Sequence, residues 1–186
     1  MRIIGGKYRG RVLETLPGLK TRPTLDMTKC AIFNSLGNYL PGFITLDVFG
    51  GSGALSFESL SRGASKSYII DNNPDAIEII KKNANNLKVL NNLKILQGDY
   101  KTILPSLVGK VKFDLIFLDP PFRMKVIEEL INYIISNNLL SDGGYIMAEY
   151  PVEDVVQKNY LNLEIKLCKR YSSSEILILE KVNIWK

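Results

Sequence analysis

Residues 44–63 read ITLDVFGGSGALSFESLSRG, and the rest of the chain repeats the arrangement that they begin. A strand-like run leads into the glycine turn at 50–53, and a stretch that favours a helix follows, ending at Gly63. A turn without side chains lets a ligand approach the backbone, and the free N–H groups of the helix start lie nearby. Most such turns are only turns, so the surrounding residues must decide whether this one binds a ligand.

Outside this stretch, segments typical of strands and helices keep alternating. Further strands are predicted at 65–71, 93–99, 113–119 and 143–150, and helices at 24–40, 73–89, 100–108 and 125–140. This alternation predicts parallel βαβ units in a doubly wound sheet. Residues 163–182 resemble two strands joined by a polar turn, an antiparallel hairpin. We therefore expect an α/β, Rossmann-like fold with a mostly parallel seven-stranded sheet.

The start of the chain, RIIGGKYRGRVLETLPGLKTRPT at 2–24, is short, basic and rich in turn residues. Its glycines between β-favouring residues predict a hairpin or an extended arm, so we divide the chain into an arm at 1–24 and a domain at 25–186. On a hairpin, Lys7, Arg9 and Arg11 would share one face, which suits phosphates. A solvated strand face is the alternative.

The composition limits the possible chemistry. The 186 residues carry a formal net charge of +5 and no histidine, and Cys30 and Cys168 lie far apart. A structural zinc site and a Cys–His nucleophile are therefore excluded, and we expect no metal. The basic balance fits either a polyanionic partner or a merely basic surface. Free thiols, no signal peptide and no membrane-length apolar run indicate a cytoplasmic protein without a membrane partner.

Two acids indicate which ligand the glycine turn could hold. Asp71 closes the next predicted strand, twenty residues after Gly51, where a carboxylate could accept from both hydroxyls of a ribose. A helix-capping role for Asp71 is the alternative. Asp47 lies four residues before Gly51, and it would repel a pyrophosphate but attract the ammonium of S-adenosylmethionine. Ser56 also departs from the sixth position of the dinucleotide fingerprint. These residues favour S-adenosylmethionine over a dinucleotide.

Two residues at the end of the third predicted strand, Asp99 and Tyr100, could face the adenine of this cofactor. Asp99 could accept from the exocyclic amine, with Tyr100 as an apolar neighbour. A solvated loop acid is the alternative for Asp99.

The sequence DPPF at 119–122 follows the fourth predicted strand, next to the crevice where doubly wound sheets bind ligands. Asp119 and the carbonyl of Pro120 could accept from both N–H bonds of a planar amine while it attacks a methyl sulfonium. The prolines, Pro121 included, would hold these acceptors rigidly, and Phe122 would stack on the flat substrate. The alternative is a strand-ending turn with Phe122 in the core.

These motifs give the chain a resemblance to class I S-adenosylmethionine-dependent methyltransferases, since DPPF matches the (D/N/S)-P-P-(Y/F/W) signature of amino-group methyltransferases. More closely, it resembles the RsmD family, which methylates the N2 amine of a guanine in 16S ribosomal RNA. The likeness rests on RIIGGKYRGR, on RPTLDMTKCAIFN at 22–34, on LDVFGGSGALSFESLSRGA at 46–64 and on FLDPPF. The family usually has Arg-Glu where Lys29-Cys30 stands here, Gly at Ser56 and Glu at Asp71.

The resemblance implies roles for individual residues. The expected catalytic residues are Asp119, Pro120, Pro121 and Phe122. The expected cofactor-binding residues are Asp47, Phe49, Gly51, Ser52, Gly53, Asp71, Asn72, Asp99, Tyr100 and Asp119. The expected RNA-binding residues are Arg2, Lys7, Arg9, Arg11, Arg22, Thr24 and Lys29, although Thr24 could instead cap the helix that follows.

The expected function is rRNA methylation at a guanine N2, which is a step of rRNA processing. We expect an RNA-binding monomer whose substrate is 16S rRNA in an assembling or assembled small subunit. A second hypothesis keeps the chemistry and moves it to adenine N6 in DNA or RNA, or to a glutamine amide. The absence of a separate target-recognition domain argues against sequence-specific DNA modification. A third hypothesis is a nucleotide-binding oxidoreductase or a non-catalytic binding module.

Overall fold

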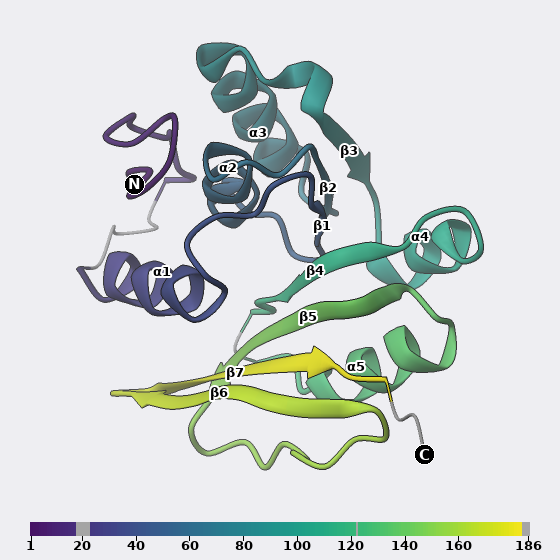
Figure 1. The fold of residues 1–186 in the computed structure, drawn as a ribbon. Helices are drawn as coiled ribbons and strands as arrows, with labels where there is room; N and C mark the ends of the chain where they lie inside the picture. The colour runs from purple at the N-terminus through teal and green to yellow at the C-terminus, as the bar shows by residue number, and fades with distance from the viewer. Residues whose placement is uncertain (18–22, 122, 184–186) are drawn as a thin grey trace.

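The computed structural model describes residues 1–17, 23–121 and 123–183 of the chain. A seven-stranded sheet with the order β3-β2-β1-β4-β5-β7-β6 runs through the molecule (Figure 1). Strands β1 to β5 pair in parallel, and β7 runs antiparallel to both β5 and β6. The predicted α/β fold with its C-terminal antiparallel hairpin is confirmed. The strands are β1 (Ile44–Asp47), β2 (Lys66–Asp71), β3 (Leu93–Gln97), β4 (Phe113–Leu118), β5 (Leu140–Pro151), β6 (Leu163–Tyr171) and β7 (Ser174–Lys181).

Helices cover both faces of the sheet (Figure 1). Successive side chains of β4 show the two layers, since Phe117 packs with Phe33 of α1 and Leu118 with Leu130 of α5. The first face carries α1 (Pro23–Ser35), α2 (Ala54–Ser61) and α3 (Pro74–Leu87). The second carries α4 (Tyr100–Leu107) and α5 (Ile127–Ser136), and the short 3-10 helix η1 (Leu90–Asn92) precedes β3.

The fifth strand is longer, and the helix before it shorter, than the sequence pattern predicts. Asn138 has a φ of 53°, which ends the helical path. The carbonyl of Leu139 then accepts from the N–H of Phe113 at 2.8 Å, and the chain enters the sheet at Leu140. These two leucines fit the helical spacing, but they belong to the sheet because the positive φ turns the chain back onto β4.

Residues 1–17 pack on the domain and form a short version of the predicted β-hairpin. An antiparallel bridge joins Arg2 and Val12, and the N–H groups of Ile3 and Leu13 donate to the carbonyls of Arg11 and Met1 at 3.0 and 2.8 Å. Ile3 and Leu13 are buried in the same hydrophobic cluster as residues of α2 and α3. The segment predicted as an arm therefore shares a hydrophobic cluster with α2 and α3, because burial of Ile3 and Leu13 removes apolar surface from water.

Candidate active site

A cavity of about 550 Å³ lies at the carboxyl ends of the parallel strands. Its volume falls in the range of pockets that bind small molecules and cofactors. Each of the five parallel strands contributes an acid to the wall within two residues of its end: Asp47, Asp71, Asp99, Asp119 and Glu149. Such a wall favours a positively charged ligand and disfavours a pyrophosphate.

The structure places most of the predicted cofactor-binding and catalytic residues around this one cavity. The predicted residues that line it are Asp47, Phe49, Gly51, Ser52, Asp71, Asn72, Asp99, Tyr100, Asp119, Pro120 and Pro121. Gly53 is not one of the lining residues. It is the N-cap of α2 with a φ of 79°, and a Cβ there would lie 2.6 Å from Cε2 of Phe57. Gly53 therefore shapes the turn and makes no contact with the cavity.

The carboxylate of Asp71 ties the glycine turn to the end of β2. The N–H of Gly51 donates to its Oδ2 and the N–H of Asn73 to its Oδ1, both at 2.8 Å. Asn73 in turn caps α3 by accepting from the N–H of Asp75. Asn73, and not Asp71, is thus the residue that caps the helix. A carboxylate has about four acceptor positions, so Asp71 keeps acceptor capacity beyond the two bonds described here.

Asp47 is a buried acid on the cavity wall, with 1% of its surface exposed. Burial raises the pKa of Asp47 to about 7, and the nearby charge of Asp71 adds to the shift. Hydrogen bonds from the backbone of Phe49 and the hydroxyl of Ser56 oppose it. An ammonium group beside Asp47 would favour its ionised form.

Asp119 lies on the same face of the sheet as Asp47, because both are in line with Phe117 in the strand register. Burial raises the pKa of Asp119 to about 8, and the charges of Glu149 and Asp47 raise it further. Burial also raises the pKa of Glu149, against the opposing hydrogen bond from Ser174. The charge of one carboxylate raises the pKa of its neighbour because it opposes a second negative charge nearby.

Aromatic rings form another part of the wall. The rings of Phe49 and Tyr100 meet edge to face with centroids 5.2 Å apart. The hydroxyl of Tyr100 is buried and has no hydrogen-bond partner within the described part of the protein. Asp99 caps α4 by accepting from the N–H of Lys101 at 2.8 Å and also lines the cavity. An adenine ring beside these residues would find an apolar face and a polar edge.

Four of the predicted RNA-binding residues, Arg2, Lys7, Arg9 and Arg11, are exposed. The alternation expected of a hairpin is absent, because the segment folds as turns after Ile4. The guanidinium of Arg11 donates to the carbonyl of Asn86 at 2.9 Å. Lys7 and Arg9 therefore lie on a turn, and Arg2 and Arg11 lie in the paired residues on either side of it.

Lys29 does not fit the prediction that it contacts RNA. Only 4% of its surface is exposed, its ammonium donates to the carbonyl of Arg2 at 2.5 Å, and Glu58 lies 3.8 Å away. The docking of α1 turns this position towards the buried acid of α2, so Lys29 lies in the cavity wall and not on the outer surface. Arg22, Phe122 and the side chain of Thr24 lie outside the described residues.

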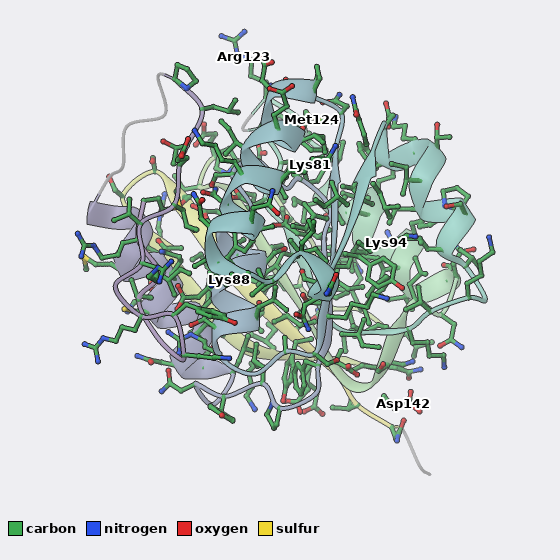
Figure 2. All side chains as sticks on the ribbon, turned by 90° about the horizontal axis from the view of Figure 1, so that it is seen from above. Lys81, Lys88, Lys94, Arg123, Met124 and Asp142 are labelled. Carbon is green, nitrogen blue, oxygen red and sulfur yellow. The ribbon has the colours of Figure 1, made fainter. Side chains whose placement is uncertain are left out.

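The sequence patterns missed several cavity residues. Glu149 stands at an alternate position of YIMAEY (145–150), on the same strand face as Met147, and an acid there was the available signal. Met1 also lines the cavity, 3.9 Å from the hydroxyl of Ser52. On the loop after β4, Met124 lines the cavity, while its neighbour Arg123 is exposed and projects outward (Figure 2).

No group of three or more His, Cys, Asp or Glu side chains suited to a metal ion occurs in residues 1–17, 23–121 and 123–183. Of the helices in these ranges, none combines the length and the apolar character that crossing a membrane requires.

Comparison with known proteins adds to this geometry. The family model described as Conserved hypothetical protein 95 matches residues 1–180. The chain is 32% identical over 182 residues to "Putative rRNA methyltransferase YlbH" of Bacillus subtilis, which covers 97% of this chain and 99% of that protein. It is 34% identical over 154 residues to "Ribosomal RNA small subunit methyltransferase D" of Escherichia coli K12, covering 83% of this chain and 76% of that protein.

A solved structure shares the fold over nearly the full length. "Putative methyltransferase yhhF from Escherichia coli" superposes with a TM-score of 0.84 at 32% identity and covers 98% of each chain. The family model and the sequence identities together assign the chain to a family. The chain belongs to the Conserved hypothetical protein 95 family and is a class I methyltransferase of the RsmD type.

Proposed function

We propose that this protein transfers the methyl group of S-adenosylmethionine to the exocyclic N2 amine of a guanine in 16S rRNA. We further propose that it acts as a monomer on an assembling or assembled small subunit. The observation that carries this proposal is a pair of acids on one wall of one cavity, the buried Asp47 beside the glycine turn and the half-buried Asp119 beside two prolines. The relatives named as rRNA methyltransferases support RNA as the substrate class.

S-adenosylmethionine is the cofactor, and the residues present suit it. Asp47 would hold the ammonium of its methionine part, and the remaining acceptor positions of Asp71 would hold the ribose hydroxyls. Asp99 would accept from the adenine amine beside Phe49 and Tyr100. When bound, the cofactor supplies a methyl group on a positively charged sulfur, which leaves as a neutral sulfide.

The role of Asp119 follows from the chemistry of the amine. The lone pair of a guanine N2 amine is delocalised into the ring, so the nitrogen is a weak nucleophile. Asp119 and the carbonyl of Pro120 would accept from its two N–H bonds and draw the nitrogen out of the plane. The proton released after attack would pass to Asp119, whose pKa, raised to about 8 by burial, suits a base that works near neutral pH.

The basic N-terminal segment supports an RNA substrate. Met1 lines the cavity and the exposed Arg2 follows it in the chain. Lys7 and Arg9 are exposed on a turn at the far end of α2, where the N–H of Lys7 donates to the carbonyl of Ser61 at 2.7 Å. Arg123 is exposed on the loop after Pro121, at another part of the rim. Phosphates on either side of a flipped guanine could meet these cations while the base enters the cavity.

Labelled methyl transfer tests the proposal. The protein and S-adenosylmethionine are incubated with naked 16S rRNA, with assembled small subunits and with DNA, and the product nucleoside is identified by mass spectrometry. We expect N2-methylguanosine from one of the two ribosomal substrates. Label only in DNA, in N6-methyladenosine or in a glutamine side chain would contradict the proposal.

A further inference from the structure

Glu149 is a second cavity carboxylate that the proposed chemistry does not use. Leu118 pairs with Ala148 in the parallel register, so Asp119 and Glu149 occupy the next pair of positions on neighbouring strands. Both therefore face the same side of the sheet, two residues beyond Phe117 and Met147. Both line the cavity, and the charge of Glu149 acts on Asp119. The two acids thus stand side by side at the place where the amine is proposed to react.

Among residues 1–17, 23–121 and 123–183, a hydrogen bond fixes one oxygen of Glu149, and its other oxygen has no partner. The hydroxyl of Ser174, at the start of β7, donates to Oε1 of Glu149 at 2.8 Å. Ser174 is itself buried, with 6% of its surface exposed. The bond orients the carboxylate and favours its ionised form. Oε2 of Glu149 therefore remains as an oriented acceptor on the cavity wall.

The three common nucleobases that carry an exocyclic amine differ in the group that lies beside it. Guanine carries its N2 amine next to N1–H, so its edge offers donors in sequence. Adenine carries its N6 amine next to an unprotonated N1, and cytosine carries its N4 amine next to an unprotonated N3. A glutamine amide likewise places a carbonyl oxygen beside its NH2 group. Two adjacent carboxylates match the two neighbouring donors of guanine. Adenine, cytosine and a glutamine amide would instead place a lone pair next to a carboxylate oxygen, which is repulsive.

We propose that Glu149 selects guanine by accepting from its N1–H while Asp119 accepts from its N2 amine. This inference rests on the proposed function, since it assumes that a nucleobase amine enters the cavity. Glu149 is a specificity-determining residue in this scheme, and Asp119 remains the group that receives the proton. A site that hydrogen-bonds a substrate N–H rejects an analogue that lacks it, because the acceptor is then left facing a lone pair.

A purine analogue separates this role from a structural one. The target guanine of a short rRNA substrate is replaced by 2-aminopurine, which keeps the 2-amino group but has an unprotonated N1. For the unchanged protein, we expect kcat/KM for the guanine RNA to exceed that for the 2-aminopurine RNA by about 10- to 100-fold, as for a hydrogen bond to a charged group. For Glu149→Gln, this ratio should fall at least about tenfold, because the amide offers both a donor and an acceptor.

Two further variants complete the test. Glu149→Asp keeps the charge and should keep the preference for guanine, even if its rate is lower. Glu164→Gln makes the same chemical change at an exposed position of β6 and should leave the ratio unchanged. Calorimetry of S-adenosylmethionine binding to each variant tests whether its cavity is still formed.

The possible failures are distinguishable. If the unchanged protein methylates no guanine N2, the proposed function itself is wrong. If it does so but accepts 2-aminopurine equally well, or if Glu149→Gln keeps the ratio, only the role of Glu149 is wrong. If Glu149→Gln is inactive on both RNAs, the role of Glu149 is judged from the unchanged protein and from Glu149→Asp. Loss of the preference for guanine over 2-aminopurine in Glu149→Asp would overturn the inference.

Discussion

Replacing Glu58 by alanine should detach the N-terminal segment and destabilise the domain. Glu58 lies in α2 with 0% of its surface exposed. Its oxygens accept from the backbone N–H groups of Ile4 and Gly5, each at 2.9 Å, and from Nε of Arg62 at 2.9 Å. One carboxylate therefore joins the first residues of the chain to the helix that follows the glycine turn.

The size of the effect follows from what the change leaves behind. Arg62 has 6% of its surface exposed, so alanine at position 58 would leave a buried guanidinium without its carboxylate. Removing one partner of a buried ion pair typically costs about 3 to 5 kcal/mol. Arg62 keeps its hydrogen bond to Oδ1 of Asn38 at 2.9 Å, which reduces the loss, but the buried Lys29, 3.8 Å from Glu58, loses the same carboxylate. For a domain of this size, we expect a fall in Tm of roughly 10 °C.

Urea and thermal unfolding measure this change, with two matched variants beside it. Glu58→Gln keeps an acceptor for the backbone N–H groups but loses the charge, so it should lie between the parent and Glu58→Ala. Glu14→Ala breaks an ion pair with Lys82 whose side chains are 44% and 62% exposed, and it should cost no more than about 1 kcal/mol. A loss below about 1 kcal/mol in Glu58→Ala would refute the reasoning.

Three further predictions concern the site and the RNA. Asp119→Ala should lower methyl transfer by a factor of about 100 or more while leaving S-adenosylmethionine affinity nearly intact, and a collapse of that affinity in calorimetry would show that the roles are misassigned. Because burial raises the pKa of Asp47 to about 7, the ionised form that pairs with the cofactor gains population as pH rises. The affinity for S-adenosylmethionine should therefore increase from about pH 6 to about pH 8, and binding should release protons. Asp47→Asn should reduce this pH dependence. Calorimetric titrations in buffers of different ionisation enthalpy measure the number of protons released. Arg9→Ala should weaken RNA binding and lower the salt slope by about 0.7 to 0.9, whereas Lys94→Ala, exposed near the start of edge strand β3 (Figure 2), should not.

Local patterns in the sequence were sufficient to predict the sheet, the glycine turn and the DPPF motif. Each of these rests on neighbouring residues: apolar spacing specifies strand or helix, glycine permits the turn before α2, and proline restricts the backbone after Asp119. Because parallel strands end at one edge of the sheet, the acids that close them could be expected around one cavity. The end of α5 was less predictable, since Leu139 and Leu140 suit a helix and a strand equally well.

Contacts between distant residues had to come from the tertiary structure. Asp119 and Glu149 lie thirty positions apart in the sequence, and only the register of β4 with β5 makes them neighbours. Lys29 resembled a surface cation until the packing of α1 on α2 brought it to Glu58. The raised pKa values of Asp47 and Asp119 also arise from the tertiary structure. Desolvation depends on all the groups packed around a carboxylate and not only on its neighbours in the chain. Periodicity reports local backbone preference, whereas burial and charge proximity arise only when the elements pack.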